Sequence, residues 1–340
     1  VKAIGLFSGG LDSILAVKVL QEQDVDVVGV TFETPFFSSG RARKIAGSID
    51  LPLRVIDITQ SHLSMLKAPP HGYGKNMNPC IDCHALMLET AGMIMDDAGA
   101  DFIFTGEVVG QRPMSQTGRS LRQVAKLSGY DGLVLRPLSA LLLPATVPES
   151  EGKVDRQRLL DIQGRGRKRQ MALADEYGIS FYPAPGGGCL LTDPAFSERL
   201  RDLLRTCPDP SIRDIELLKL GRHLRISRDV KIAVGRNREE NEAILGITHE
   251  NDIILSVRNV PGPVVIIPGG AGMDEVERAA AVCAFYSDAS RDAHVHVLAR
   301  GNHAERVVET MPMDAEEVRS MIIERRPKNA NASAIHLNKS

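Results

Sequence analysis

The sequence has no tryptophan, and phenylalanine and tyrosine together make up only 4% of its 340 residues. We therefore do not expect recognition of bases or sugars to depend mainly on exposed aromatic rings. The net charge is −2, so any contact with nucleic acid must come from local basic patches rather than from the field of the whole protein. No apolar run reaches the roughly eighteen residues of a membrane span. We expect neither such a span nor a signal peptide, and hence a cytoplasmic protein without a membrane partner.

Cysteine is also scarce, with five residues. This number does not predict a disulfide framework in a chain of this size, and metal binding or thiol chemistry is the better expectation. The hydrophobic fraction of 43% and the charged fraction of 25% are typical of a globular protein that buries a sizeable core. The length predicts about two domains.

The first half of the chain alternates apolar strand-like segments with helical ones, which predicts an α/β fold with a parallel sheet and helices on both faces. In such sheets, ligands bind beyond the carboxyl ends of the strands. The expected strands are 1–7, 25–32, 53–58 and 102–105, and the expected helices are 11–23, 41–49 and 83–98.

The second half begins with a bend at 141–152, followed by a helix rich in basic residues and a glycine-rich stretch at 183–188. From about residue 196, shorter segments predict a smaller α+β domain. Its expected helices are 197–204, 275–286 and 315–324, and its expected strands are 231–234, 253–257, 264–267 and 294–298. We thus expect an α/β domain over 1–150, a basic linker that packs on it over 151–195, a second domain over 196–330 and a flexible tail over 331–340.

A glycine-rich hexapeptide follows the first predicted strand and opens the first helix. Two glycines let the backbone approach a ligand closely, and the unpaired N–H groups of a helix start attract an anion. The same pattern also suits a plain strand-to-helix turn with an N-cap, but the full hexapeptide in this context favours a phosphate site. Its residues are Ser8, Gly9, Gly10, Leu11, Asp12 and Ser13.

This hexapeptide resembles the loop of the PP-loop ATP pyrophosphatases, which adenylate a carbonyl oxygen with ATP and release pyrophosphate. The resemblance implies the adenine nucleotide alpha hydrolase-like fold for residues 1–150, with ATP on the hexapeptide and Mg²⁺ held with the help of Asp12. It also implies adenosine contacts at the end of the second strand, from Val30, Thr31 and Phe32. The P-loop kinase motif is missing, which argues against γ-phosphoryl transfer.

Two further motifs indicate the branch of this family. The segment Asn78-Pro79-Cys80-Ile81-Asp82-Cys83 resembles the Asn-Pro-Cys-x-x-Cys segment of tRNA 2-thiouridylases. The segment from Thr105 and Gly106 to Gln111 is similar to one that closes over the nucleotide in tRNA 4-thiouridine synthetases. Both resemblances imply thiolation of tRNA, and they leave open which uridine is modified.

The Cys80–Cys83 pair alone is compatible with buried small residues, a zinc site or a redox disulfide. A third cysteine, Cys189, follows three glycines, and if it folds back to the pair, three thiolates converge. Three such ligands on a 4Fe–4S cluster leave one iron open for hydrosulfide. In the rival mechanism Cys189 carries a persulfide that attacks the adenylated carbon and is released by a disulfide with Cys83. We expect the cluster, because persulfide transfer needs only two thiols; structural zinc with His84 as fourth ligand ranks third.

Two regions are candidates for RNA contact. Arginine and lysine crowd the stretch 155–170, where Gly164 and Gly166 give a pliable backbone suited to phosphates of tRNA or of ATP, although a solvated helix face is the plainer alternative. The candidate residues there are Arg165, Arg167, Lys168 and Arg169.

In the second domain, residues 234–241 and 251–265 resemble the NFACT-R domain, a predicted RNA-binding module. The family often has aromatic residues where this chain has Ile253 to Ser256, so binding would depend on Arg236, Asn237 and backbone contacts. These residues could also simply form turns.

The sequence therefore predicts an ATP-dependent tRNA thiouridine synthetase in which Asp12, Cys83 and Cys189 are catalytic. The expected cofactors are ATP, Mg²⁺ and a 4Fe–4S cluster, and the expected partners are tRNA, a sulfur donor (hydrosulfide or a cysteine desulfurase) and a second copy of the chain. The alternative from another class is a non-catalytic factor that binds nucleotide and RNA.

Overall fold

The computed structural model describes residues 1–112, 114–182, 188–301 and 304–323. The chain divides into two units, Val1–Thr192 and Asp193–Ser340. Most of the glycine-rich stretch expected at 183–188, and the whole tail expected at 331–340, lie outside the described residues. No described helix is both long enough and apolar enough to cross a membrane.

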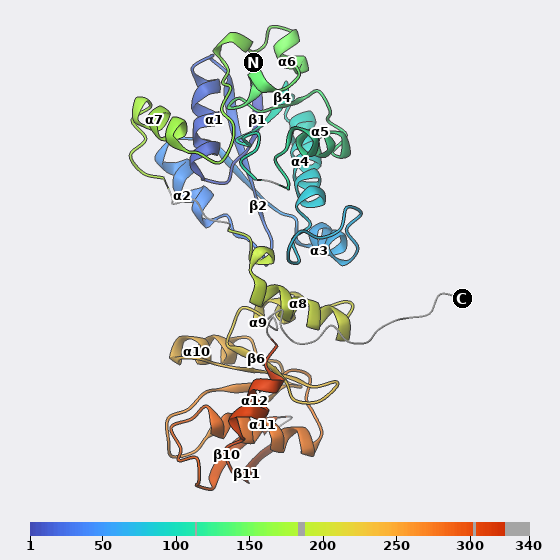
Figure 1. Ribbon diagram of the computed structural model, residues 1–340, viewed down its shortest axis with the longest axis vertical. Coiled ribbons are helices and arrows are strands. Elements are labelled where there is room, and N and C mark those ends of the chain that lie inside the picture. Colours follow the sequence, from blue (N-terminus) through green and yellow to red (C-terminus); the bar gives the residue numbers. More distant parts are fainter. Residues whose placement is uncertain (113, 183–187, 302–303, 324–340) are drawn as a thin grey trace, which may run out of the picture. The chain divides into compact units, whose positions relative to one another are not determined.

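Unit 1 contains a five-stranded sheet in which every pair of neighbouring strands is parallel. Helices cover both faces, with α1 and α7 on one and α4 and α5 on the other (Figure 1). The predicted α/β fold class is confirmed. In order across the sheet, the strands are β3 (Leu53–Asp57), β2 (Asp26–Glu33), β1 (Lys2–Leu6), β4 (Phe102–Thr105) and β5 (Val134–Leu135).

The two helical layers follow from the alternation of side chains along each strand. Ala3 and Phe104 point to the core under α1, whereas their neighbours Ile4 and Ile103 point to the core under α4 and α5. The helices of unit 1 are α1 (Leu11–Gln21), α2 (Gly40–Ser48), α3 (Thr59–Lys67), α4 (Cys80–Asp97), α5 (Gly118–Leu127), α6 (Val147–Ser150) and α7 (Lys168–Glu176).

The strand order fixes where a ligand can bind. From β1 the chain crosses over to β2 on one side, and the sheet continues to β4 on the other side, so the order reverses between β1 and β4. In parallel sheets, ligands bind at the carboxyl edge next to such a reversal of the strand order. The residues after β1 and β4 are therefore the natural ligand-binding residues of unit 1.

Some sequence expectations were wrong in detail. Helix α4 begins at Cys80, three residues before the expected start, because Pro79 occupies the N-cap and the Cys83 N–H already bonds its carbonyl at 2.9 Å. The expected basic helix is only a 3₁₀ turn at Arg156–Arg158 and a loop. Gly164 has a φ of +82° and donates to the Val109 carbonyl at 2.7 Å, which keeps this stretch extended until α7 begins.

The bend expected at 141–152 contains a 3₁₀ turn, Ala140–Leu142, and the short helix α6. Thr146 and Glu149 form a capping box that starts α6. Helices α3 and α5 and strand β5 were not expected at all, although the buried residues of α5, Leu121, Val124 and Ala125, follow helical spacing.

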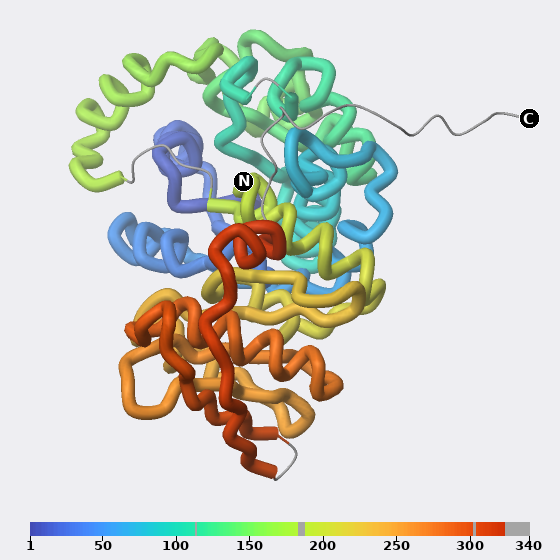
Figure 2. Tube along the Cα trace, turned by 60° about the horizontal axis from the view of Figure 1, so that its bottom comes forward, coloured from blue at the N-terminus to red at the C-terminus, as the bar shows by residue number. Residues whose placement is uncertain are grey.

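Unit 2 is an α+β unit, as expected, whose described strands form an antiparallel six-stranded sheet. Its outermost hairpin, β10–β11, is the orange-to-red pair at the bottom of Figure 2. In order across the sheet, the strands are β11 (Ala304–Thr310), β10 (Val295–Gly301), β8 (Ile253–Val257), β9 (Val265–Ile267), β7 (Lys231–Val234) and β6 (Arg222–Arg225).

The helices of unit 2 are α8 (Pro194–Thr206), α9 (Ile212–Leu217), α10 (Arg238–Gly246), α11 (Met273–Phe285) and α12 (Ala315–Met321). Helix α11 packs its apolar face, which includes Val276 and Ala280, into the core of the sheet. Helices α9 and α10 and strands β6 and β11 had not been expected.

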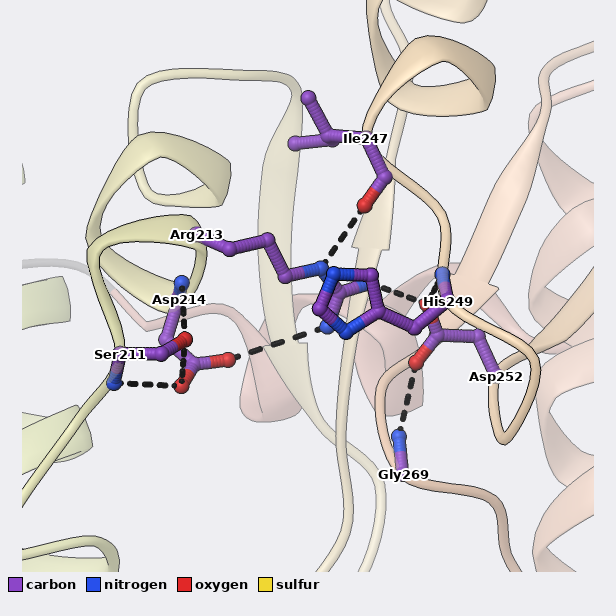
Figure 3. Close-up of polar contacts among 7 residues, drawn as sticks. All are labelled: Ser211, Arg213, Asp214, Ile247, His249, Asp252 and Gly269. Carbon is purple, nitrogen blue, oxygen red and sulfur yellow. Dashed lines mark hydrogen bonds and ion pairs between the residues drawn. The ribbon is translucent and has the colours of Figure 1, made fainter.

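A buried ion pair ties α9 to two loops of this unit (Figure 3). Arg213 bonds the carboxylate of Asp252 and also donates to the Ile247 carbonyl at 2.8 Å. Asp252 accepts the backbone N–H groups of His249, at 2.7 Å, and Gly269, at 3.0 Å. Because every partner of Asp252 is a donor, this cluster is structural and fixes the turn before β8.

Candidate active site

The loop between β1 and α1 holds its own conformation. The Gly10 N–H donates to Ser8 Oγ at 3.3 Å, and Ser13 Oγ donates to the Gly10 carbonyl at 2.8 Å. Gly9 has a φ of +69°, and a Cβ there would lie 3.0 Å from the Cα of Ala42. The loop thus presents the first N–H groups and the positive end of α1, which together bind an anion such as phosphate.

Gly106, just after β4, packs directly on this loop. A Cβ at Gly106 would lie 2.6 Å from the backbone carbon and oxygen of Asp12 and from the backbone nitrogen of Ser13. Only a residue without a side chain fits at such a separation. Thr105, which precedes it, is buried at the end of β4. The loops after β1 and β4 therefore meet at the reversal point of the strand order.

Asp12 is held by the same loop after β4. Its Oδ2 accepts from Gln111 Nε2 at 3.0 Å, while its Oδ1 is buried and has no hydrogen-bond partner among the described residues. A buried carboxylate oxygen without a partner is costly, and Mg²⁺ prefers carboxylate and phosphate oxygens. The free Oδ1 therefore fits a Mg²⁺ ligand beside the phosphates of a nucleotide.

The residues expected to contact adenosine lie in the second half of β2. Val30, Thr31 and Phe32 are each no more than 6% exposed, and Val30 and Phe32 pack into the core under α4 and α5. The Val30 carbonyl accepts from the Phe7 N–H at 2.8 Å. A nucleotide at this strand would consequently meet backbone more than side chains.

Cys80 and Cys83 stand in the first turn of α4, three residues apart and hence on one face. Asn78 Nδ2 donates to the Cys80 sulfur at 3.2 Å. Both sulfurs therefore lie at the amino-terminal end of this 18-residue helix, and Cys80 also has a side-chain donor beside it.

Cys189 is brought to α4 by a docked segment. The Leu190 N–H donates to the Phe36 carbonyl at 3.0 Å, in the loop after β2. Asn76 Nδ2, in the loop before α4, donates to the Thr192 carbonyl at 2.6 Å. Thr192 Oγ1 in turn donates to the Cys189 carbonyl at 2.7 Å. These bonds anchor the residues that follow Cys189 to both neighbouring loops.

The three thiols interact electrostatically. Burial raises the pKa of Cys83 most, and the nearby Cys189 and Cys80 raise this pKa further. Burial also raises the pKa of Cys189, to about 11, with Cys80 adding to the shift and Arg112 opposing it. Cys83 and Cys189 are therefore protonated at neutral pH until a cation joins them, since metal ligation deprotonates thiols.

Three converging thiols are the donor set of an iron–sulfur cluster. Across the described parts of the chain, no three His, Cys, Asp or Glu side chains are grouped so as to hold a metal ion. His84, the residue expected as a fourth zinc ligand, contacts Glu107 through its Nδ1 at 2.9 Å.

A buried ionic network centred on Glu107 supports the loop after β4 and the start of α4. Glu107, whose side chain is 12% exposed, accepts from Arg136 Nε at 3.1 Å and from Thr105 Oγ1 at 3.0 Å, and contacts His84 Nδ1. Burial acts to raise the pKa of Glu107, but Arg136, His84 and Thr105 outweigh it and hold this pKa at about 2. Arg136 also donates to the Leu121 carbonyl at 3.1 Å. The ionised Glu107 thus connects β4, α4 and α5.

The basic stretch starts beside the same loop. Ser139 Oγ donates to the Ile162 carbonyl at 2.6 Å and accepts the Val109 N–H at 3.0 Å, next to the Val109–Gly164 bond described above. Of the four candidates, Arg165 and Lys168 are exposed, and the guanidinium of Arg169 pairs with Asp161 at 2.7 Å. Arg167 Nε is buried and has no hydrogen-bond partner in the described part of the chain.

The two candidates in unit 2 have local partners. Arg236 Nε donates to Glu240 at 2.9 Å, and this ion pair raises the pKa of Arg236. Asn237 is the N-cap of α10, because its side-chain oxygen accepts the Glu240 N–H at 2.9 Å. Both residues therefore stabilise the start of α10. Arg236 is exposed there, although its guanidinium is already paired with Glu240.

Sequence reasoning missed the residues that support the site. Arg136, Asn78 and Arg112 received no role, and Glu107 was noted only as part of a motif. A single arginine directly after the apolar run 133–135 was a usable signal, because a charge at the carboxyl end of a buried strand needs a buried partner. Asp82 was also missed; it is buried between the cysteines and bonds His71 Nδ1 at 2.6 Å.

Replacing Gly106 with alanine should displace the phosphate loop. The added Cβ overlaps the Asp12 backbone, and overpacking of this kind costs about 1–3 kcal/mol. We expect ATP affinity, measured by calorimetry, to fall about tenfold or more. The matched control is Gly47→Ala in α2, where the described residues leave open space and affinity should not change. Equal ATP affinity of both variants would contradict the close packing.

Glu107→Gln should make stability depend less on pH. The folded pKa of Glu107, about 2, lies below its ordinary 4.5, so its charge stabilises the fold by about 3 kcal/mol above pH 4.5 and this contribution fades as the pH falls toward 2. In urea unfolding, the free energy of unfolding of Glu107→Gln should lie well below that of the wild type at pH 7, and this difference should shrink below pH 4.5. Glu305→Gln, at an exposed pair, is the control. A deficit that stays constant with pH would refute the ionic network.

Two protein families match the chain. Residues 1–142 match the family model described as thiamine biosynthesis protein (ThiI), and residues 221–322 match the NFACT protein RNA binding domain. A tRNA-specific 2-thiouridylase MnmA from Desulfosudis oleivorans is 32% identical over 110 residues, covering 30% of this chain and 30% of its own length. A probable tRNA sulfurtransferase from Thermotoga maritima is 31% identical over 121 residues, covering 32% of this chain and 30% of its own length.

The chain spans about a third of the length of the curated relatives it matches. A solved 4-thiouridine synthetase–RNA complex with bound ATP is 24% identical, covers 63% of this chain and 52% of its own, and gives a TM-score of 0.37. The resemblances predicted from the motifs, to tRNA thiouridine synthetases and to the NFACT RNA-binding module, are confirmed. Residues 1–142 are thus similar to the ThiI family, and residues 221–322 are similar to the NFACT protein RNA binding domain.

Proposed function

We propose that the protein uses ATP to activate a uridine carbonyl in tRNA and replaces its oxygen with sulfur. One observation carries this proposal: two consecutive residues after β4 connect the phosphate loop with the thiols. Gln111 holds the Asp12 carboxylate at 3.0 Å, and the charge of Arg112 acts on the pKa of Cys189. A nucleotide on the loop would therefore lie beside the sulfur centre.

The activation step uses the residues of the phosphate loop. The uridine carbonyl oxygen attacks the α-phosphorus of ATP, the bond from that phosphorus to the β-phosphate oxygen breaks, and pyrophosphate leaves. Ser8, Ser13 and the first N–H groups of α1 would hold the phosphates, and Asp12 would hold Mg²⁺, which would supply positive charge beside the departing pyrophosphate. Adenylation turns a poor leaving oxygen into a good one.

In the second step a sulfur nucleophile attacks the activated ring carbon, the carbon–oxygen bond breaks, and AMP carries the oxygen away. Cys80, Cys83 and Cys189 would hold a 4Fe–4S cluster, which supplies an open iron where hydrosulfide from the sulfur donor can bind. Asn78 would donate to the Cys80 ligand and tune its charge. Three thiols are available in this region, and a persulfide mechanism needs only two. This supports the assignment of a cluster.

Phosphates of the tRNA would be met by the basic stretch. Arg165 and Lys168 are exposed, and they follow Gly164, which bonds the loop after β4 that holds Asp12. Arg167 has a buried Nε without a hydrogen-bond partner among the described residues. The names of the relatives, a tRNA-specific thiouridylase and a probable tRNA sulfurtransferase, support tRNA as the substrate. In the C-terminal domain, Arg236 and Asn237 would contribute to RNA contact.

Asp12→Ala should abolish tRNA-dependent release of pyrophosphate while the fold is retained. Loss of the metal-orienting carboxylate removes several kcal/mol of charge stabilisation, which predicts a rate at least about a hundredfold lower. Asp97→Ala, at an exposed position near the end of α4, should release pyrophosphate normally. A wild-type protein that releases none with any tRNA would instead support the non-catalytic factor.

Cys189→Ala should prevent assembly of the cluster. After anaerobic reconstitution with iron and sulfide, the wild type and the control Cys207→Ala should show broad absorption at the visible–near-UV boundary, and Cys189→Ala should lack it. If wild type and Cys189→Ala reconstitute alike, the cluster assignment is wrong. Mass spectrometry of tRNA nucleosides after turnover then identifies which uridine carries the sulfur.

A further inference from the structure

Unit 2 contains a cluster of two aromatic rings and two guanidinium groups at the end of α11. Phe285 and Tyr286 have ring centroids 4.9 Å apart and meet edge to face at 89°. The Arg291 guanidinium carbon lies 4.0 Å from the Phe285 centroid, and that of Arg222, on β6, lies 4.8 Å from the Tyr286 centroid. These four residues form what we name the arginine–aromatic surface.

Its geometry is fixed by surrounding bonds. Arg291 donates to the Phe285 carbonyl at 2.7 Å, so its guanidinium stays over the ring while the residue remains exposed. The Asp288 N–H donates to the Pro261 carbonyl at 2.9 Å, which holds the turn after α11 against the neighbouring loop. The Arg291 guanidinium is thus held in place before any ligand arrives, which lowers the entropy cost of binding.

Arg236, a candidate RNA residue, borders the same surface. Its partner Glu240 also interacts with the backbone of Gly221, the residue directly before Arg222. Arg236 therefore lies near the start of β6, where its guanidinium can add hydrogen-bond donors for phosphate.

The charge balance of this domain decides what kind of contact can give affinity. Residues 221–322 contain 12 lysines and arginines and 16 aspartates and glutamates. A domain with this excess of acid cannot hold RNA by general attraction to the phosphate backbone. Affinity must come from a local site in which bases stack, because stacking does not need a positive field.

We propose that the arginine–aromatic surface binds an unpaired segment of RNA, with bases stacked on the guanidinium planes of Arg222 and Arg291. This rests on the proposed function, in which the substrate is tRNA, and it assigns the residues that recognise it. Guanidinium planes and aromatic rings both stack unpaired bases, whereas bases inside a duplex are already stacked and inaccessible. The ligand class is therefore single-stranded RNA.

The test replaces each arginine with lysine in the full chain, which keeps the charge and removes the planar group. Binding to a short oligouridine carrying one 2-aminopurine is measured by anisotropy and by fluorescence quenching, and a fully paired RNA hairpin serves as the second probe. Arg222→Lys and Arg291→Lys should each weaken single-strand binding about fivefold or more and reduce the quenching, with an unchanged salt slope. Thermal melting verifies that both variants fold.

Arg300→Lys is the matched control, because Arg300 lies on β10 of the same unit and pairs with the exposed Glu305 at 2.8 Å. It should bind as the wild type does. If the wild type binds RNA and both variants bind it equally well, the assignment of RNA binding to the arginine–aromatic surface is wrong, and the proposed function stands. Equal losses on the hairpin would overturn the assignment to unpaired bases. A wild type that binds neither RNA would overturn both proposals.

Discussion

The close approach of Gly106 to the backbone of Asp12 and Ser13 is the constraint on which the site depends. It joins the loops after β1 and β4 where the strand order reverses, with no side chain between them. The positions of the nucleotide-binding and sulfur-binding residues depend on that contact. The short segment after Gly106 carries Gln111 to Asp12 and Arg112 to the neighbourhood of Cys189, so one loop connects nucleotide chemistry with sulfur chemistry.

The site combines rigid support with unsatisfied polar groups. Behind it, Glu107 is fully engaged by Arg136, His84 and Thr105, and its depressed pKa records how strongly that network favours the charge. At the carboxyl edge of the sheet, Asp12 Oδ1 has no partner among the described residues, and Cys80 and Cys189 add to the raised pKa of Cys83. Protein interiors seldom leave polar atoms in this condition without a ligand to satisfy them. Cations at both positions would relieve the cost.

Much of the fold was predictable because its signals are local. The alternation of apolar segments predicted four of the five strands of unit 1 nearly to the residue, and Phe102–Thr105 was predicted with its observed bounds. The expected basic helix forms only from Lys168, as α7, and the stretch before it is not helical beyond a 3₁₀ turn. Its conformation is set by Gly164 pairing with Val109, a contact between residues 55 positions apart that no local pattern records. Arg222 and Tyr286 likewise meet only in the folded sheet.

By itself the sequence determined the phosphate loop, the cysteine pair and the two families, because each depends on residues adjacent in the chain. Only the tertiary structure decided that Cys189 reaches Cys83, that Glu107 is buried and ionised, and that two arginines cover an aromatic pair. The physical reason is that burial, pKa and stacking are properties of surroundings. Those surroundings are built from segments far apart in sequence, and they exist only once the chain has folded.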